Sequence, residues 1–239
     1  MDTITILSGI PSMATITVST DVKLPNPRIG GEVLPTIKLT YFNLRARAEP
    51  ARLLLAYAGV EYEDERLPPP WEDIEKWGAR KKDYPYGCLP MLYWGEEELG
   101  QSLAIARFIA QKVGLAGRDS LESAQVDEIV LALQDVFNAG YAVVFEKNAE
   151  RKAELASKHK NQTIPQLLKN IEARLASRGG LYLVGNRVTW ADIQTFYFCS
   201  ELADQEVLSQ VPRLKSLVDR VGNIPNIKTW MEIRPSNPF

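Results

Sequence analysis

The sequence predicts an α/β domain followed by an all-α domain, and three observations carry this prediction. Over residues 36–114 the apolar pattern changes in the order strand, helix, strand, strand, strand, helix, a βαβ–ββα plan. Two glycines within 114–117 end this part, and beyond them only helical spacing occurs. A mixed segment followed by a helical one is typical of two domains. We therefore expect domains at 36–114 and 120–239, preceded by an extension over 1–35.

Glycines and prolines divide the first half of the chain into short elements. Ile37–Tyr41 is predicted to be a buried strand, and about Ala48–Ala58 a helix that ends at Gly59. Pro50 fits this helix because the N–H groups of a first turn have no partners within the helix. The later elements are a strand at Tyr62–Leu67, a break at Pro68–Pro70, a polar segment at Trp71–Lys82, a hairpin of Pro90–Trp94 with Glu97–Leu99, and a helix at Gln101–Val113.

The second half has helical patterns throughout. Leu121–Tyr141 and Leu155–Leu175 carry apolar residues at helical spacing. The run Thr189–Asp192 is typical of a capping box at the start of another helix. Pro212 and Pro225 each fit the first turn of a further helix.

Composition narrows the function classes. The chain has 239 residues, of which 45% are hydrophobic and 24% charged, as in ordinary globular proteins. A net charge of -2 gives no basic field for nucleic acid. No apolar run reaches about 18 residues, so no membrane-spanning helix is expected. Cys88 and Cys199 are too few and too far apart for a disulfide framework, which fits a reducing, intracellular setting. With His159 as the one histidine, we expect no metal site.

Residues 1–35 differ from the rest because they are rich in Thr, Ser, Ile, Val and Pro. Only Lys23 and Arg28 carry positive charge, which is too few for a secretory or mitochondrial signal. We expect a mobile extension, and Met13 is a possible alternative start.

Polar side chains occur where predicted elements begin or end. Tyr41 ends the first strand and Arg47 precedes the first helix, and ligands of open α/β sheets bind at such strand ends. Ser102 is predicted to be the N-cap of a helix, whose free N–H groups attract a carboxylate, with Gln101 beside it. The alternatives are structural: a serine that only caps its helix, and a tyrosine that only closes the core.

Five short motifs carry a resemblance to a known family: Ile37–Pro50, Gly87–Pro90, Gln101–Arg107, Thr189–Asp192 and Asn223–Pro225. They resemble the glutathione transferases, closest to the sigma class, from Thr36 to about Pro235. The resemblance implies a thioredoxin-like first domain, glutathione as co-substrate without a metal, and a cytoplasmic homodimer. It also implies that Tyr41 hydrogen-bonds the glutathione sulfur and favours the thiolate, the reactive form of a thiol.

The other glutathione contacts implied by the resemblance are Phe42, Arg47, Trp71, Leu89, Pro90, Gln101, Ser102 and Asp135. A cis bond before Pro90 would let Leu89 pair with the cysteinyl backbone as an added strand, whereas a trans proline would simply begin a strand. Trp71 would meet the glycyl end, or else cover surface. Asp135 would reach the glutamyl amine across a dimer interface, or else be a solvated helix charge.

The sequence departs from the family pattern in two places. Cys88 stands where the family often has a lysine for the glycyl carboxylate, and a basic residue among Lys76 and Arg80–Lys82 is a substitute. Residues 137–142 lack the tryptophan of prostaglandin D synthases, and only Asp135 remains of their metal-sensitive acidic cluster. We therefore do not expect prostaglandin isomerisation or magnesium activation.

The predicted function is conjugation of glutathione to apolar electrophiles, for detoxification. The electrophile pocket is expected at Leu44, Phe137, Tyr141 and Phe145, together with C-terminal residues. A glutathione-dependent isomerase or peroxidase, and a crystallin-like or ligand-carrying protein without turnover, are the alternatives. A cysteine-based enzyme using Cys88 is a further one.

Overall fold

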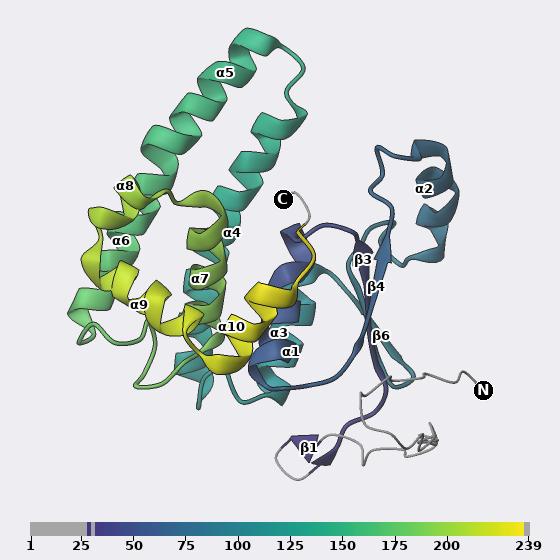
Figure 1. Cartoon of the computed structure of the whole chain (residues 1–239), viewed down its shortest axis with the longest axis horizontal. Coiled ribbons are helices and arrows are strands. Elements are labelled where there is room, and N and C mark those ends of the chain that lie inside the picture. Colours follow the sequence, from purple (N-terminus) through teal and green to yellow (C-terminus); the bar gives the residue numbers. More distant parts are fainter. Residues whose placement is uncertain (1–27, 30–31, 237–239) are drawn as a thin grey trace, which may run out of the picture.

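The computed structural model describes residues 28–29 and 32–236, and places a four-stranded sheet beside a bundle of helices (Figure 1). The prediction of an α/β domain followed by an all-α domain is confirmed. The sheet order is β4-β3-β5-β6, with β3 parallel to β4 and antiparallel to β5. The strands are β3 Ile37–Phe42, β4 Glu63–Leu67, β5 Met91–Trp94 and β6 Glu97–Gly100.

β3 is an inner strand of this sheet and is buried on both faces. Apart from the half-buried Lys38, all its residues are buried, as expected for a strand covered on both sides. The helices α1 (Glu49–Tyr57) and α3 (Ser102–Lys112) lie between the sheet and the helical bundle (Figure 1). α2 (Ile74–Arg80) lies on the other side of the sheet.

The boundaries in the first half follow the local chemistry. A 3-10 turn, Ala46–Ala48, precedes α1, and α1 ends before Gly59, whose φ is 64°. α2 forms inside the segment predicted only as polar, because the Asp73 side chain accepts a hydrogen bond from the Lys76 N–H and caps it. The bond between Leu89 and Pro90 is cis, as the family resemblance implies.

The N-cap of α3 is Gln101, so the prediction of Ser102 as the N-cap is wrong by one residue. Gln101 has a φ of 70°, and this backbone turn comes directly before the helix. Ser102 is therefore already the first helical residue. Its N–H is among the free N–H groups of a helix start.

The second half consists of α4 Ser120–Phe145, α5 Ala149–Lys158, α6 Ile164–Ser177, α7 Trp190–Leu202, α8 Gln205–Ser209, α9 Pro212–Gly222 and α10 Pro225–Ile233. The predicted capping box of α7 is confirmed, and both predicted prolines begin helices. The pattern at Leu155–Leu175 covers two helices joined by a π-helical turn, His159–Thr163. α8 was not predicted, because five residues show no periodicity.

α4 has the length and composition of a membrane-crossing helix, whereas the sequence pattern predicted no such helix. One face of α4 nevertheless belongs to the protein core, with Val126, Ile129, Val130, Leu133, Val136 and Phe137 buried at helical spacing. Four large apolar side chains of α4 are exposed, namely Leu121, Leu131, Val144 and Phe145. The buried face identifies α4 as a core helix of the bundle.

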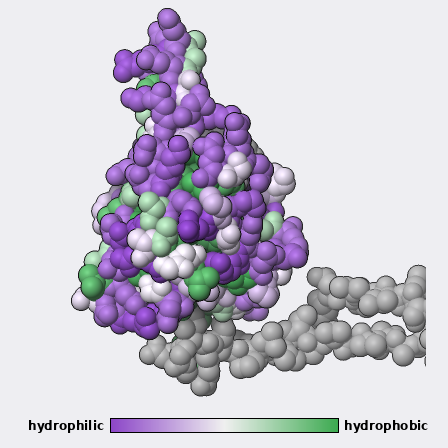
Figure 2. All heavy atoms as spheres, turned by 90° about the vertical axis from the view of Figure 1, so that its left-hand side faces the viewer, coloured by the Kyte–Doolittle hydropathy of each residue, from purple (hydrophilic) through white to green (hydrophobic). Residues whose placement is uncertain are grey.

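The outer face of the helical domain is mostly hydrophilic, with scattered apolar residues (Figure 2). The projection at the top of that view is the hairpin of α4 and α5, and α5 has no buried residue. At the other end of the molecule, β1 (Arg28–Ile29) pairs with β2 (Glu32–Val33), and Leu34 is buried. These last residues of the predicted extension are thus part of the fold. The rest of that prediction, including Met13, lies outside the described residues.

Candidate active site

Tyr41 lies near the C-terminal end of β3 and is only 5% exposed. Burial raises the pKa of its phenol to about 12, and the nearby Tyr141 adds to this effect. The backbone N–H of Arg47 donates a hydrogen bond to the phenol oxygen and lowers the pKa, as do the charges of Arg47 and Arg52. The phenol therefore stays protonated at neutral pH. It can donate a hydrogen bond to an anion placed beside it.

Arg47 lies in the 3-10 turn between β3 and α1, and its exposed guanidinium reaches across to α4. The guanidinium lies over the ring of Tyr141, 4.6 Å from the ring centroid. Its Nη2 is 3.4 Å from Oδ1 of Asn138. Burial raises the pKa of Tyr141, while the charge of Arg47 and its hydrogen bond lower it. Arg47 thus links the two halves of the chain beside Tyr41.

Two other predicted residues meet at the start of α3. The Gln101 side-chain nitrogen lies 4.0 Å from the sulfur of Cys88, which is half-buried. Leu89 and Pro90, which follow Cys88, are buried. Ser102 is the first residue of the helix, where backbone N–H groups and the helix dipole favour a carboxylate.

A cleft between the sheet domain and the helical bundle brings several predicted residues together. From the first half of the chain, Arg47 and Ser102 line it, and from α4, Phe137 and Tyr141. Arg47 and Ser102, which are expected to bind a polar ligand, thus share the cleft with Phe137 and Tyr141, which are expected to bind an apolar one. The remaining lining residues were not predicted; they are Ala46, Pro50, Leu103, Gln134, Gln194 and Tyr197.

Other predicted residues lie away from this cleft. Leu44 is buried, and its carbonyl accepts a hydrogen bond from Arg52. Phe145 is 76% exposed as the last residue of α4, and Trp71 is 67% exposed before α2. Asp135 is exposed on α4.

The structure also identifies residues that sequence reasoning missed. Phe42 packs edge-on against Trp77, with ring centroids 4.8 Å apart, so Trp77 supports the end of β3. Its signal was the second tryptophan of the Trp71–Lys82 segment. Gln194 and Tyr197 come from α7, which is buried around its whole circumference from Trp190 to Cys199, so the sequence pattern indicated no cleft-facing side.

The described part of the chain holds no group of three or more His, Cys, Asp or Glu side chains placed to bind a metal. The cleft is lined instead by the guanidinium of Arg47 and by Ser102 at the N-terminus of α3, and the buried phenol of Tyr41 lies beside Arg47. These groups suit an organic ligand with carboxylates and a group that becomes an anion.

Two family models match most of the chain. The model of the glutathione S-transferase N-terminal domain matches residues 37–111, and that of the C-terminal domain matches residues 134–234. Among curated relatives, hematopoietic prostaglandin D synthase of Gallus gallus is 38% identical over 210 residues, 84% of this chain and 98% of the relative. Glutathione S-transferase 1 of Ascaris suum is 37% identical over 218 residues, 86% of this chain and 100% of the relative.

Solved structures of related proteins share this fold. Prostaglandin synthase D of Nilaparvata lugens matches with a TM-score of 0.76 and 31% identity, over 85% of this chain and 100% of its own. A glutathione S-transferase of Necator americanus, described as monomeric, matches with a TM-score of 0.75 and 32% identity, over 85% of this chain and 100% of its own. Sequence, fold and site thus agree, and the chain belongs to the glutathione S-transferase family.

Proposed function

We propose that this glutathione transferase is sigma-class-like and uses Tyr41 to hold the sulfur of glutathione as a thiolate. A free thiol has a pKa near 8.5, and a hydrogen bond donated to its charged form lowers that value. The observation that carries the proposal is the buried, protonated phenol of Tyr41 beside the inter-domain cleft. The enzyme would accelerate conjugation by ionising the sulfur and by holding two reactants together.

In this proposal glutathione lies along the first domain, residues 36–114. Its γ-glutamyl carboxylate meets the N-terminus of α3 at Gln101 and Ser102. Its cysteinyl backbone pairs with Leu89, next to the cis Pro90. Arg47 orients the tripeptide. The other proposed contacts are Phe42, Trp71 and, for the glycyl carboxylate, a basic residue among Lys76 and Arg80–Lys82.

The electrophile would bind on the side of the helical domain, residues 120–239. Phe137 and Tyr141 supply aromatic surface in the cleft. Leu44 and Phe145 complete the proposed pocket only if the chain near them moves, since one is buried and the other exposed. Such a pocket accepts many apolar electrophiles, which fits detoxification in the cytoplasm.

We also propose a homodimer, in which Asp135 reaches the glutamyl amine of glutathione bound to the partner. Asp135 is exposed on α4, and so is Leu131, one turn earlier. An exposed apolar residue beside an exposed carboxylate fits a helix that faces another copy. Light scattering after gel filtration tests this: a mass of two chains supports it, and a mass of one chain contradicts it.

The test of the catalytic proposal is conjugation of glutathione to 1-chloro-2,4-dinitrobenzene by the wild type and by Tyr41→Phe. We expect the variant to lose about ten- to hundred-fold in activity, the effect of one hydrogen bond to a charged group, and to keep glutathione binding. No loss in Tyr41→Phe would contradict the role of Tyr41. Absence of glutathione binding in the wild type would favour a ligand carrier.

Glutathione-dependent isomerisation is the second candidate, because several relatives are named prostaglandin D synthase. Against prostaglandin as the substrate, residues 137–142 contain no tryptophan. A wild type that binds glutathione tightly but conjugates no electrophile would favour an isomerase or peroxidase of narrow specificity.

A further inference from the structure

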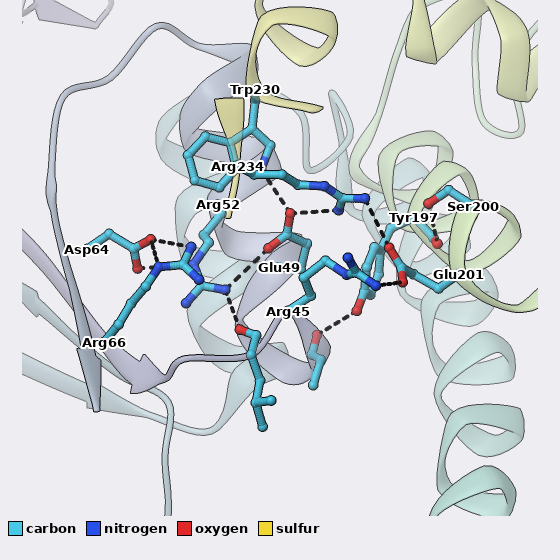
Figure 3. A network of polar contacts seen from close by, with 12 residues as sticks. Arg45, Glu49, Arg52, Asp64, Arg66, Tyr197, Ser200, Glu201, Trp230 and Arg234 are labelled. Atoms are coloured by element: carbon cyan, nitrogen blue, oxygen red, sulfur yellow. Dashed lines mark hydrogen bonds and ion pairs between the residues drawn. The ribbon is translucent and has the colours of Figure 1, made fainter. Parts of the chain in front are cut away.

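A single peptide group lies between two tyrosines, one from each domain. Its carbonyl, that of Ala46, accepts a hydrogen bond of 3.1 Å from the hydroxyl of Tyr197 on α7 (Figure 3). Its N–H, that of Arg47, donates to the phenol oxygen of Tyr41. The hydroxyl of Tyr197 is thus connected to the hydroxyl of Tyr41 through one amide.

The backbone at this peptide is in an unusual conformation. Ala46 has a φ of 33°, in the left-handed region that residues with a Cβ rarely adopt. Such a conformation persists only where surrounding contacts hold it. The Tyr197 hydrogen bond is one such contact. A second is the ion pair between Arg45 and Glu201 of α7, at 2.9 Å (Figure 3).

Tyr197 is itself held rigidly. It is buried, and its ring stacks on Phe137 of α4 with centroids 5.8 Å apart and planes at 16°. The hydroxyl therefore presents a fixed donor to the Ala46 carbonyl. A hydrogen bond at one end of an amide polarises the amide and strengthens the hydrogen bond at its other end.

We propose that Tyr197 is a positioning residue for Tyr41, acting through the peptide group between Ala46 and Arg47. The hydroxyl of Tyr197 holds this amide in register with Tyr41 and makes the Arg47 N–H a better donor. Because the Arg47 N–H occupies a lone pair of the phenol oxygen, the phenol proton is left to point at the glutathione sulfur. The expected effect of Tyr197 on catalysis rests on the proposed function, whereas the hydrogen bonds around the amide do not.

The matched variants are Tyr197→Phe and Tyr62→Phe. The first removes the hydroxyl and keeps the ring that stacks on Phe137. The second removes a buried hydroxyl that has no hydrogen-bond partner, so it controls for loss of a phenol oxygen alone. Four quantities are measured in each variant: the pKa of the bound glutathione thiol from its ultraviolet absorbance, kcat and KM for conjugation, and the rate of deuterium exchange of the Arg47 amide without glutathione.

We expect the thiol pKa to rise by about half to one unit in Tyr197→Phe. At a pH below that pKa, kcat of Tyr197→Phe then falls about three- to ten-fold, while its KM for both substrates changes little. Tyr62→Phe should resemble the wild type. In a Tyr41→Phe background, Tyr197→Phe should have no further effect on kcat, because the two residues act as one unit.

Two outcomes overturn the inference. One is unchanged exchange of the Arg47 amide in Tyr197→Phe. The other is a loss of kcat equal in the Tyr41→Phe and wild-type backgrounds, which would assign Tyr197 to electrophile binding. If the wild type does not ionise glutathione, the proposed function fails, and faster exchange of the Arg47 amide in Tyr197→Phe still supports the positioning role.

Discussion

Cys88 is the residue at which the candidate site departs most from the family pattern. Its sulfur lies near the Gln101 amide, 4.0 Å from the nitrogen, and next to the buried Leu89. A cysteine at this position lacks the ammonium group with which a lysine would bind a carboxylate. In the proposed glutathione complex, any ion pair with the glycyl carboxylate would therefore come from a basic residue at another position.

Replacement Cys88→Lys is expected to lower KM for glutathione about two- to five-fold, since a partly exposed ion pair contributes up to about 1 kcal/mol. Steady-state kinetics with varied glutathione measures this. Cys88→Ser is the control, and we expect its kcat to match the wild type. A Cys88→Ser enzyme without activity would instead support a cysteine-based mechanism.

Individual site residues differ in how far the sequence could predict them. Arg47, Ser102, Phe137 and Tyr141 stand at element ends or on a clear helix face, and the cleft contains all four. The N-cap was misplaced because the positive φ of Gln101 leaves no sequence signal when the residue is not glycine.

At the scale of elements, α7 organises the helical domain. Its capping box holds the buried Asp192, which accepts hydrogen bonds from the Leu183 N–H at 2.9 Å and from Thr189. The sequence at 189–192 predicted where α7 begins, because a capping box involves residues that are close together in the sequence. The contacts of α7 with the cleft were not predictable in the same way, since they depend on packing between distant helices.

The capping box gives the fold a defined pH dependence. Burial raises the pKa of Asp192 to about 6 from its ordinary value of 3.8, against the opposing hydrogen bonds from Leu183 and Thr189. The native state thus binds the proton more tightly than the unfolded chain, and the stability that this group contributes is lost as pH rises through about 6. Through Asp192 alone, the free energy of unfolding should fall by roughly 1 kcal/mol between pH 5 and pH 7.

Urea unfolding at pH 5 and pH 7 measures this, with Asp192→Asn as the variant that cannot titrate. We expect the stability difference between the two pH values to shift by that amount in the variant. The same pH difference in both proteins would mean that Asp192 does not titrate in this range.

Across the whole molecule, a charge network joins the two domains (Figure 3). Glu49 of α1 is fully buried and pairs with Arg52 at 3.2 Å and with Arg234, beyond α10, at 3.0 Å. It also accepts a hydrogen bond from the indole of Trp230. Arg234 also forms an ion pair with Glu201 of α7, and Arg52 forms one with Asp64 of β4. Sheet, first helix, central helix and C-terminal helix thus share one network.

Glu49→Gln is expected to lower the free energy of unfolding by about 3 kcal/mol, because two arginines would lose their shared buried carboxylate. Urea denaturation measures this. Asp219→Asn, which breaks the exposed ion pair with Lys215, is the control and should cost less than about 1 kcal/mol. An equal, small loss in both variants would show that the network does not hold the domains together.

The overall architecture was predictable because strand and helix periodicities and the family motifs are local signals. The extent of the network was not, because no local pattern in the sequence brings Arg234 and Glu201 to the buried Glu49 of α1. α1 packs against both α7 and α10, and its Glu49 and Arg52 are fully buried. The burial of Glu49 and Arg52 near the candidate active site thus results from packing between the two domains.

The central claim is that the hydroxyl of Tyr41 ionises glutathione, and the most direct measurement is the pKa of the bound thiol. Ultraviolet absorbance of the thiolate is followed against pH for glutathione bound to the wild type and to Tyr41→Phe. We predict a pKa well below the free value of about 8.5 in the wild type, and a value near the free one in Tyr41→Phe. The same lowered pKa in both proteins would contradict the account.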